Sequence, residues 1–364
     1  MNDQKYWLGF SLISGIGPRR LTTLLNWFGD LPSAWRAGES QLQESGLEPQ
    51  PRSNLIRMRA QIDLDAEWER VQQAGVRLLT LVDDAYPPSL KTLADPPVVL
   101  YVKGTLLPVD QNALSVVGTR KATHYGLEAA YKLSGALAKQ GVTIVSGLAQ
   151  GIDTAAHRGA LSAGGRTIAV LGSGIDQIYP ADNRDLANEI THSGALISEF
   201  PLGTAPEGRN FPRRNRVISG IALGVLVVEA PERSGALITA DIAAEQGREV
   251  FAIPGNIFSP ASRETNRLIQ QGAKLVMSAD DILDELSISY TRVEAKHITE
   301  AIVPASGTEA QILNILSVDP LHVDDIARTC GLPIAQVTST LTILELKGLA
   351  RKVGPMQYCL IPGR

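Results

Sequence analysis

The stretch Leu114-Ser115-Val116-Val117-Gly118-Thr119-Arg120 joins a short apolar run to a glycine turn and a cation. Similar runs recur along the chain, and helix-length segments with amphipathic spacing separate them. The runs are nearly continuous in Val, Ile and Leu, which is typical of strands that are covered on both faces. Their regular alternation with helices predicts a parallel, doubly wound α/β sheet. The predicted strands are Leu114–Val117, Thr143–Val145, Thr167–Leu171, Ala195–Ile197, Val225–Val228, Val250–Ile253 and Lys274–Val276.

Glycine turns follow most of these predicted strands. In a doubly wound sheet, ligands bind beyond the carboxyl ends of the strands. Glycine lets a phosphate approach the backbone there, and the next helix presents free N–H groups at the positive end of its dipole. The sequence therefore predicts an anion-binding edge. Its candidate residues are Gly118, Thr119, Arg120 and Lys121 after the first strand, Ser146, Gly147 and Gly151 after the second, and Ser234 and Gly235 after the fifth.

Two standard phosphate-binding motifs are missing from the sequence. It contains no GxxxxGK[ST] loop, which argues against a P-loop ATPase. Gly172-Ser173-Gly174 is followed three residues later by Gln177, so the GxGxxG fingerprint is incomplete and a dinucleotide-binding fold of the usual type is not expected.

A cluster of arginines lies between two of the predicted strands. Arg209 precedes the segment Asn210-Phe211-Pro212-Arg213-Arg214-Asn215-Arg216, in a chain whose net charge is only −4. The guanidinium fork fits phosphate oxygens and also stacks on bases, and Arg120 is placed to do the same. The cluster favours a polyanionic ligand, with nucleic acid or a nucleotide as the leading candidates. A solvated surface, or a salt bridge for Arg120, is the alternative.

Composition limits the class of protein. The chain has 364 residues, of which 44% are hydrophobic and 20% are charged, as in ordinary soluble proteins. Two cysteines indicate a reducing compartment without a disulfide framework. The five histidines are scattered, so neither a metal nor a cofactor is expected. No basic-then-apolar leader is found, and no apolar run approaches the roughly 20 residues that span a bilayer. We therefore expect a cytoplasmic protein with no membrane contact.

Three further segments surround the predicted sheet domain, which spans residues 76–286. Residues 1–75 have helical spacing, and Gly15-Ile16-Gly17-Pro18 between two short helices predicts a helix-hairpin-helix turn or a plain helical corner. Val98–Val102 is predicted to be an edge strand. Residues 287–306 are predicted to be a linker, and residues 307–364 a winged helix with helices at Ala310–Leu316, Val323–Thr329 and Ile334–Leu346 and a two-stranded wing after them.

Three acidic or basic side chains could serve acid–base chemistry. Asp153 and His157 lie four residues apart on one helical face, a spacing that suits proton transfer but more often braces the start of a helix. Glu229 ends the fifth predicted strand, where it could act in catalysis or orient an arginine.

The order of these motifs resembles the DNA-processing protein A (DprA/Smf) family. The resemblance covers roughly residues 80 to 285. It rests on Val117–Arg120, Ser146–Asp153, Ala169–Gly174, Ile178–Pro180, Ser198–Pro201, Asn210–Arg216, Ser234–Leu237 and Phe251–Gly255. It implies an extended Rossmann-like domain that binds single-stranded DNA, forms a homodimer and carries a DNA-contacting arginine at Arg120. It also implies protection of incoming DNA during natural transformation and delivery of a RecA-type recombinase, with no enzymatic activity.

Two other functions remain open at this stage. A Rossmann-like phosphoribohydrolase would carry PGGxGTxxE after the fifth strand, but here residues 230–241 lack the glycine pair and end in Asp241. A duplex-DNA regulator would need cations on the recognition helix, whereas Ile334–Lys347 carries one Lys and one Glu.

Overall fold

The structure is a computed structural model that describes residues 3–286, 307–316, 321–346, 350–354 and 356–360. It divides into two compact units, Met1–Val293 and Glu294–Arg364, which are treated separately below. The predicted linker, 287–306, lies outside the described residues. Within the described ranges, no helix is both long and apolar enough to cross a membrane.

The first unit is built on a nine-stranded sheet with the order β1-β2-β6-β5-β4-β3-β7-β8-β9. Strands β3 to β9 pair in parallel and β1 and β2 pair antiparallel, so the doubly wound parallel sheet is confirmed. The strands are β1 (Arg77–Thr80), β2 (Val99–Gly104), β3 (Ala113–Val117), β4 (Thr143–Ser146), β5 (Thr167–Leu171), β6 (Gly194–Ser198), β7 (Gly224–Val227), β8 (Glu249–Ala252) and β9 (Lys274–Leu275).

One strand differs from the prediction. Val98–Val102 was predicted to lie at an edge, but β2 is internal, because β1 pairs with its free side. Strand β1 was not predicted from the sequence. It is only four residues long and follows a helix directly, so it offers too short a pattern to be recognised.

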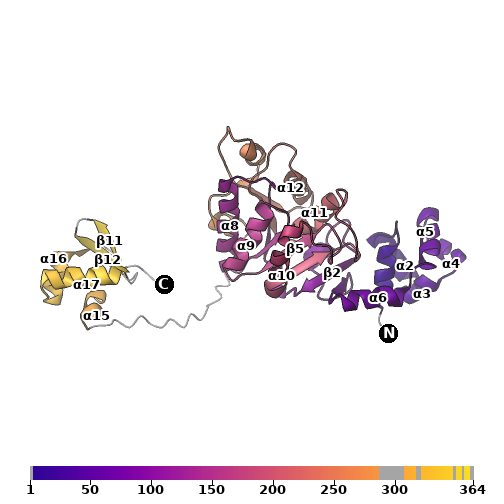
Figure 1. Ribbon diagram of the computed structural model, residues 1–364, viewed down its shortest axis with the longest axis horizontal. Helices are drawn as coiled ribbons and strands as arrows, with labels where there is room; N and C mark the ends of the chain where they lie inside the picture. The colour runs from indigo at the N-terminus through magenta and orange to yellow at the C-terminus, as the bar shows by residue number, and fades with distance from the viewer. Residues whose placement is uncertain (1–2, 287–306, 317–320, 347–349, 355, 361–364) are drawn as a thin grey trace. The chain divides into compact units, whose positions relative to one another are not determined.

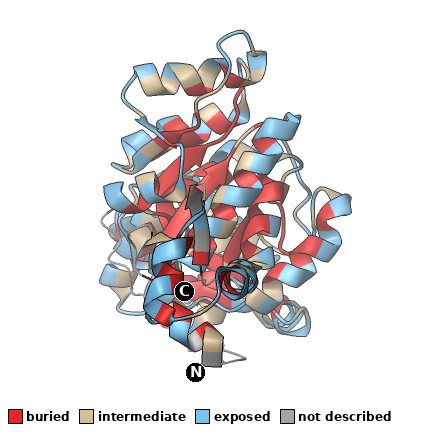
Figure 2. Cartoon of the chain, turned by 90° about the vertical axis from the view of Figure 1, so that its left-hand side faces the viewer, coloured by how far each residue is buried: buried red, intermediate tan, exposed pale blue. Residues whose placement is uncertain are grey.

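Helices cover both faces of the sheet (Figures 1 and 2). On one face, apolar residues of β3, β4, β7 and β8 pack against α8 (His124–Lys139), α9 (Ile152–Ser162) and α14 (Ala279–Glu285). On the other face, the sheet packs against α7 (Pro88–Lys91), α11 (Asn210–Ile221) and α12 (Gly235–Glu245). Figure 2 shows the strands buried and the outer sides of the helices exposed. The strands have continuous apolar runs because helices cover both faces of the sheet.

The sheet changes its direction of winding between β3 and β7. From β3, the strands β4, β5 and β6 follow one another to one side, whereas β7, β8 and β9 follow to the other. Loops that leave the carboxyl ends of β3 and β7 therefore diverge and leave a crevice between them, which is where doubly wound sheets bind ligands.

The N-terminal segment consists of six helices that share a core with the sheet. The helices are α1 (Gln4–Leu12), α2 (Pro18–Phe28), α3 (Leu31–Arg36), α4 (Glu39–Glu44), α5 (Pro49–Arg59) and α6 (Leu64–Gln73). The predicted glycine corner joins α1 to α2, and Gly15 has φ +90°, a conformation that favours glycine. Phe10 and Trp35 belong to the same buried cluster as Tyr101 of β2, so the hydrophobic core continues across the predicted boundary at residue 75.

The second unit is a winged helix, as predicted. It contains α15 (Gly307–Leu313), α16 (Val323–Cys330) and α17 (Ile334–Leu346), and a sheet with the order β10-β12-β11. The wing strands are β11 (Ala350–Gly354) and β12 (Gln357–Leu360). A third strand that the sequence did not predict, β10 (Leu321–His322), pairs with β12. The core of this unit is formed mainly by Ile312, Ile326, Val337, Leu341 and Tyr358.

Candidate nucleic-acid interface

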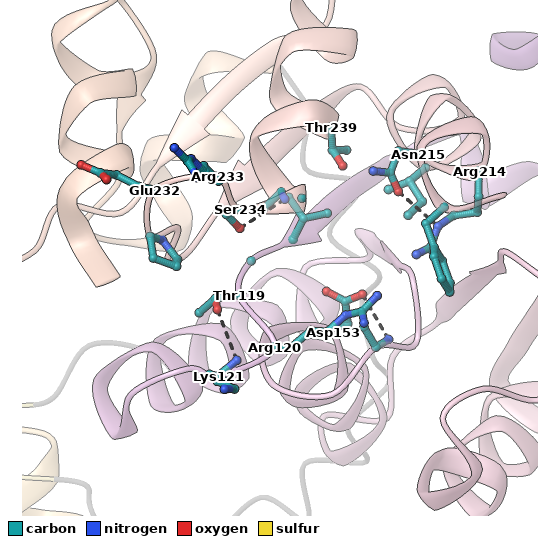
Figure 3. A pocket seen from close by; sticks show the side chains of 18 residues that line it. Thr119, Arg120, Lys121, Asp153, Arg214, Asn215, Glu232, Arg233, Ser234 and Thr239 are labelled. Atoms are coloured by element: carbon teal, nitrogen blue, oxygen red, sulfur yellow. Dashed lines mark hydrogen bonds between the residues drawn. The ribbon is translucent and has the colours of Figure 1, made fainter. Parts of the chain in front are cut away.

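A pocket of about 390 Å³ opens at the crevice between β3 and β7 (Figure 3). Six segments line it: the loops after β3, β4 and β7, and residues of the helices α9, α11 and α12. The residues that line it are Val117 to Lys121, Ala149, Asp153, Phe211, Arg214, Asn215, Ile218, Pro231 to Ala236, and Thr239. Seven of the predicted site residues after the strands therefore meet at one place, together with three from the arginine segment. They are Gly118, Thr119, Arg120, Lys121, Ser234, Gly235, Phe211, Arg214, Asn215 and, across a smaller adjoining pocket, Gly147.

Two guanidinium groups and the ring of Tyr179 surround the ring of Phe211, which lines both this pocket and the smaller one beside it. The Arg120 guanidinium carbon lies 5.3 Å from the centroid of the Phe211 ring, and that of Arg214 lies 5.7 Å from it. The ring of Tyr179 lies 6.1 Å from the Phe211 ring. Arg120 is exposed and forms no ion pair among the described residues, so its predicted alternative role in a salt bridge is not supported. A cation and an aromatic face that are both accessible can hold a flat, electron-rich ring.

Arg214 contacts the Phe211 ring from a buried position. Its side chain is buried (5% exposed), and its Nη1 donates to the carbonyl oxygens of Gly147 (2.7 Å) and Val170 (2.6 Å). A Cβ atom on Gly147 would lie 2.3 Å from that nitrogen, so only glycine leaves room for the guanidinium. Burial lowers the pKa of Arg214 to about 10, and the nearby Asp153 carboxylate opposes this shift. The group therefore stays charged at neutral pH.

Asp153 and His157 do not form an acid–base pair. The Asp153 carboxylate accepts hydrogen bonds from the amides of Gly147 (3.1 Å) and Ala149 (3.2 Å), which shapes the loop after β4. His157 bonds instead to Thr167 Oγ1 (2.7 Å) on β5. Burial raises the pKa of Asp153 and lowers that of His157 to about 3. Both side chains hold α9 in place, which is the structural role that their four-residue spacing allowed as an alternative to proton transfer.

Glu229 is also a structural residue. It is 1% exposed and accepts hydrogen bonds from the amide (2.9 Å) and the hydroxyl (2.5 Å) of Thr123, the N-cap of α8. A Cβ atom on Gly126 would lie 2.4 Å from its carboxyl group, so the first turn of α8 closes over it. It neither orients an arginine of the segment 210–216 nor faces the pocket as a catalytic acid would.

The arginine segment is divided by its own helix, so not all of its predicted site residues lie at this pocket. Arg213 and Arg216 do not line the pocket: both pair with the carboxylate of Glu199, and Arg216 also donates to the carbonyl oxygen of Asp95 (2.6 Å). Asn210 is buried and its amide reaches the carbonyl oxygen of Ala205 at 3.4 Å. The reason is helical geometry, since residues two and five positions after Phe211 point away from the face that it shares with Arg214.

Two predicted residues near the second strand are structural as well. Ser146 is buried and donates to the carbonyl oxygen of Val116 (2.6 Å), which ties β4 to β3. Gly151 has φ +81°, and a Cβ atom there would lie 2.5 Å from the carbonyl oxygen of Thr119. It permits a close approach of two loops and does not itself line the pocket.

Sequence reasoning missed Tyr179 and Arg233. In the sequence, Tyr179 was recognised only within the family motif Ile178–Pro180, although it is exposed and lines the smaller pocket beside Phe211. Arg233 is one of the residues that line the main pocket, in the loop after β7, and it has φ +61°. A cation within a strand-end turn was a usable signal for Arg233, whereas the closeness of Tyr179 to Phe211 depends on tertiary folding.

The fold and the site define a doubly wound α/β protein with a cationic, aromatic pocket at the switch point of its sheet. Comparison with protein families adds two matches. The model of the DNA recombination-mediator protein A family matches residues 77–287, and that of the DprA winged helix domain matches residues 299–354. The chain belongs to the DNA-processing protein A (DprA/Smf) family.

Individual relatives are similar over most of the chain. Protein Smf of Synechocystis is 36% identical over 98% of both chains, and DNA processing protein DprA of Streptococcus pneumoniae is 46% identical over 57% of this chain and 73% of its own. The X-ray structure of the latter protein superposes with a TM-score of 0.68, at 38% identity, over 78% of this chain and 98% of that one. A Helicobacter pylori DNA processing protein A structure, described for its single-stranded DNA binding mode, gives a TM-score of 0.53 at 30% identity, over 59% of this chain and 97% of that one.

Proposed function

We propose that this protein binds single-stranded DNA without regard to sequence, at the pocket between β3 and β7. The observation that carries the proposal is the exposed Arg120 guanidinium over the Phe211 ring, 5.3 Å from its centroid, with Tyr179 beside it. Such a platform accepts the face of any base, because every base has a π-face. Membership of a family of DNA-processing proteins supports the same conclusion.

The phosphates would be held by a different set of groups. Ser234 and Gly235 start α12, and its first amides and positive dipole end face the pocket. Lys121 and Arg233 are exposed cations on opposite sides of the pocket (Figure 3). None of these groups reads a base edge, which is why no sequence preference is expected here. Each stacked base contributes on the order of 1–3 kcal/mol, and paired bases in a duplex cannot offer their faces.

The test is the replacement of Arg120 by Ala. We expect weaker binding to every single-stranded sequence, by roughly tenfold or more if one stacked base is lost. The salt dependence should also become shallower, by about 0.7 in the slope of log K against log salt for each lost phosphate contact. Fluorescence anisotropy at several salt concentrations measures both quantities.

Arg158→Ala is the matched control, since Arg158 is an exposed arginine on α9 that lines neither pocket. Equal affinities for the Arg120 and Arg158 variants, or binding that is insensitive to salt, would show that this pocket is not the site. A marked preference of the native protein for duplex DNA would favour the regulator instead.

Protection of incoming DNA and delivery of a RecA-type recombinase are included in the proposal, and family membership is their support. Both need the strand to be held first, so the Arg120→Ala variant should lose them together with binding. A non-enzymatic role fits the burial of Glu229 under α8. A regulator that reads duplex DNA is not favoured, because the sequence of α17 carries no Lys or Arg.

A further inference from the structure

The pocket between β3 and β7 has an apolar interior behind its exposed cations. Arg120, Lys121 and Arg233 are exposed, and they suit the phosphates of a strand. Ile218 and Ala236 also line the pocket, but they are buried and present apolar atoms to it. A charged phosphate would lose its hydration against such a surface, so the interior suits an uncharged part of the ligand.

Two polar side chains of this interior lack hydrogen-bond partners. Thr239 on α12 is 2% exposed and Asn215 on α11 is 8% exposed, and both line the pocket (Figure 3). Asn215 Oδ1 accepts a hydrogen bond from Nε of Arg214 (3.2 Å), but among the described residues its Nδ2 and the Thr239 hydroxyl have no partner. Neither atom is sealed in the core, so both are open to the pocket. Polar groups at this depth are usually satisfied, which indicates that a ligand or water meets them here.

The ligand group that matches both side chains is a hydroxyl. The Asn215 amide can only donate at Nδ2, whereas Thr239 Oγ1 can donate or accept. A hydroxyl accepts from the first and donates to the second, so it satisfies both at once. The edges of the bases differ in their donors and acceptors, and a contact to them would impose a sequence preference. A sugar hydroxyl is the same in every nucleotide and imposes none.

Only the ends of a DNA strand carry such a hydroxyl. Within a strand, the 3′ and 5′ oxygens of every sugar belong to phosphodiester bonds. We propose that the interior of this pocket is a subsite for the terminal sugar of a DNA strand, whose free hydroxyl bonds to Asn215 and Thr239. The proposal rests on the proposed binding of single-stranded DNA to the same pocket. It adds a preference for strand ends and leaves the binding independent of base sequence.

The spacing along α11 fits a strand that ends in this pocket. Phe211 and Asn215 are four residues apart, so they lie on the same side of the helix and about 6 Å apart along its axis. Both line the pocket, so a strand can meet both without crossing another element. A base that stacks on Phe211 can therefore belong to one of the last nucleotides when the terminal hydroxyl lies at Asn215.

The test removes one terminal hydroxyl at a time from an oligo-dT of about 10 nucleotides, a length within the roughly 4–16 nucleotides that single-strand sites cover. Hydrogen replaces the hydroxyl at the 3′ end of one oligonucleotide and at the 5′ end of another, and each competes with a labelled strand for the native protein. We expect one of the two changes to weaken binding roughly threefold to tenfold, as the loss of neutral hydrogen bonds does. The end that is affected identifies the terminal sugar.

Variants of Thr239 show whether the hydroxyl is bound at this place. Thr239→Val replaces the hydroxyl by a methyl group and should bring the affinity ratio of the unmodified and the deoxy-ended oligonucleotide close to one, whereas Thr239→Ser should keep the preference. Thr191→Val, at a half-buried threonine of α10 (Arg184–Ser193) that lines neither pocket, is the matched control and should keep the native ratio. The native comparison needs no variant, so it decides the proposal even if Thr239→Val folds poorly.

Three results would overturn the subsite. They are equal native affinity for all three oligonucleotides, an end preference that is unchanged in Thr239→Val, and oligo-U that binds more tightly than oligo-dT whatever its ends, because the 2′-hydroxyl of RNA would then be the group bound. The Arg120→Ala variant should weaken every oligo-dT strand alike. If it does so and no end preference is found, only the subsite is excluded, whereas no effect of Arg120→Ala would exclude the DNA-binding site itself.

Discussion

At the scale of single residues, neighbouring arginines of one motif have different roles. Arg214 is buried and holds the loop after β4 and the end of β5, whereas Arg216 is bound to Glu199 and Asp95. Among the arginines that the structure describes, Arg120, from a different part of the chain, is the one that combines exposure with contact to Phe211. The cationic character of the segment 210–216 therefore overstates the charge that a DNA strand would meet in the pocket.

We expect Arg214→Ala to lower the free energy of unfolding, an effect that comes before any effect on DNA binding. The change leaves the buried Asp153 carboxylate without its nearby cation and the carbonyl oxygens of Gly147 and Val170 without a donor. Breaking a buried charge pair costs roughly 3 kcal/mol or more. Gly147→Ala should have a similar effect, because its Cβ would displace the same guanidinium.

Thermal or urea unfolding measures the stability of both variants. Gly164→Ala is not a suitable reference variant, because Gly164 has φ +71°. Gly235→Ala is the better control, since its Cβ would meet no atom within 4 Å and its φ is not positive. If Gly147→Ala were as stable as Gly235→Ala, Arg214 would not be the strut that we describe.

At the scale of elements, α9 is attached to the sheet through a neutral histidine. The hydroxyl of Thr167 donates to the carbonyl oxygen of Ile144 (2.7 Å), so Nδ1 of His157 carries the proton that Thr167 Oγ1 accepts. Nε2 of the ring is buried and has no partner among the described residues. A protonated ring could not be accommodated there, and burial lowers the pKa of His157 to about 3.

This histidine predicts a loss of stability in acid. The unfolded chain takes up a proton at His157 near its ordinary pKa of 6.5, while the folded protein does not do so until about 3. Stability therefore falls as the pH drops below 6.5, by up to about 1.4 kcal/mol per pH unit from this group. The raised pKa values of Asp153 and Glu199 act in the opposite direction, because the folded state then binds protons more readily than the unfolded chain.

A comparison of variants isolates the histidine from those carboxyl groups. His157→Asn can keep the hydrogen bond to Thr167 but has no proton to gain, so its stability advantage over the native protein should grow, or its deficit shrink, as the pH falls below 6.5. Urea unfolding at a series of pH values gives the difference. His192→Asn, at an exposed histidine of α10, should follow the native curve, and parallel curves for all three proteins would contradict the prediction.

At the scale of the whole molecule, the sheet ends in an exposed apolar region. Strand β9 is the last of the nine, and the loops that follow β8 and β9 carry Ile257 (77% exposed), Phe258 (87%) and Met277 (80%). Parallel neighbours place these two loops at the same edge of the sheet. Large exposed apolar side chains can mark interaction surfaces, so we propose that the predicted homodimer contact lies here.

Phe258→Ser should therefore shift the protein from dimer to monomer. Loss of one well-buried aromatic side chain at an interface costs on the order of 2 kcal/mol or more, about thirtyfold in the dimer dissociation constant. Analytical ultracentrifugation measures the shift. Trp27→Ser, which removes an aromatic residue that is 57% exposed on α2, should leave the dimer intact. A native protein that is monomeric at every concentration, or a Phe258→Ser variant that dimerises normally, would exclude this surface.

The apolar runs and the spacing of glycines were enough to predict the parallel sheet, the winged helix and the glycine turns around Arg120. Uninterrupted apolar runs can only be buried between two helical layers, and tight strand-to-helix turns need glycine wherever two backbones or a guanidinium approach closely. Which of the charged side chains are available to a ligand depends on the folded arrangement of the elements. The partners of Arg213, Arg216 and Glu229 lie on other elements of the chain, and pairing with those partners takes these side chains away from the pocket. The contact of Arg120 with Phe211 depends in the same way on the order of the strands, which no local pattern specifies.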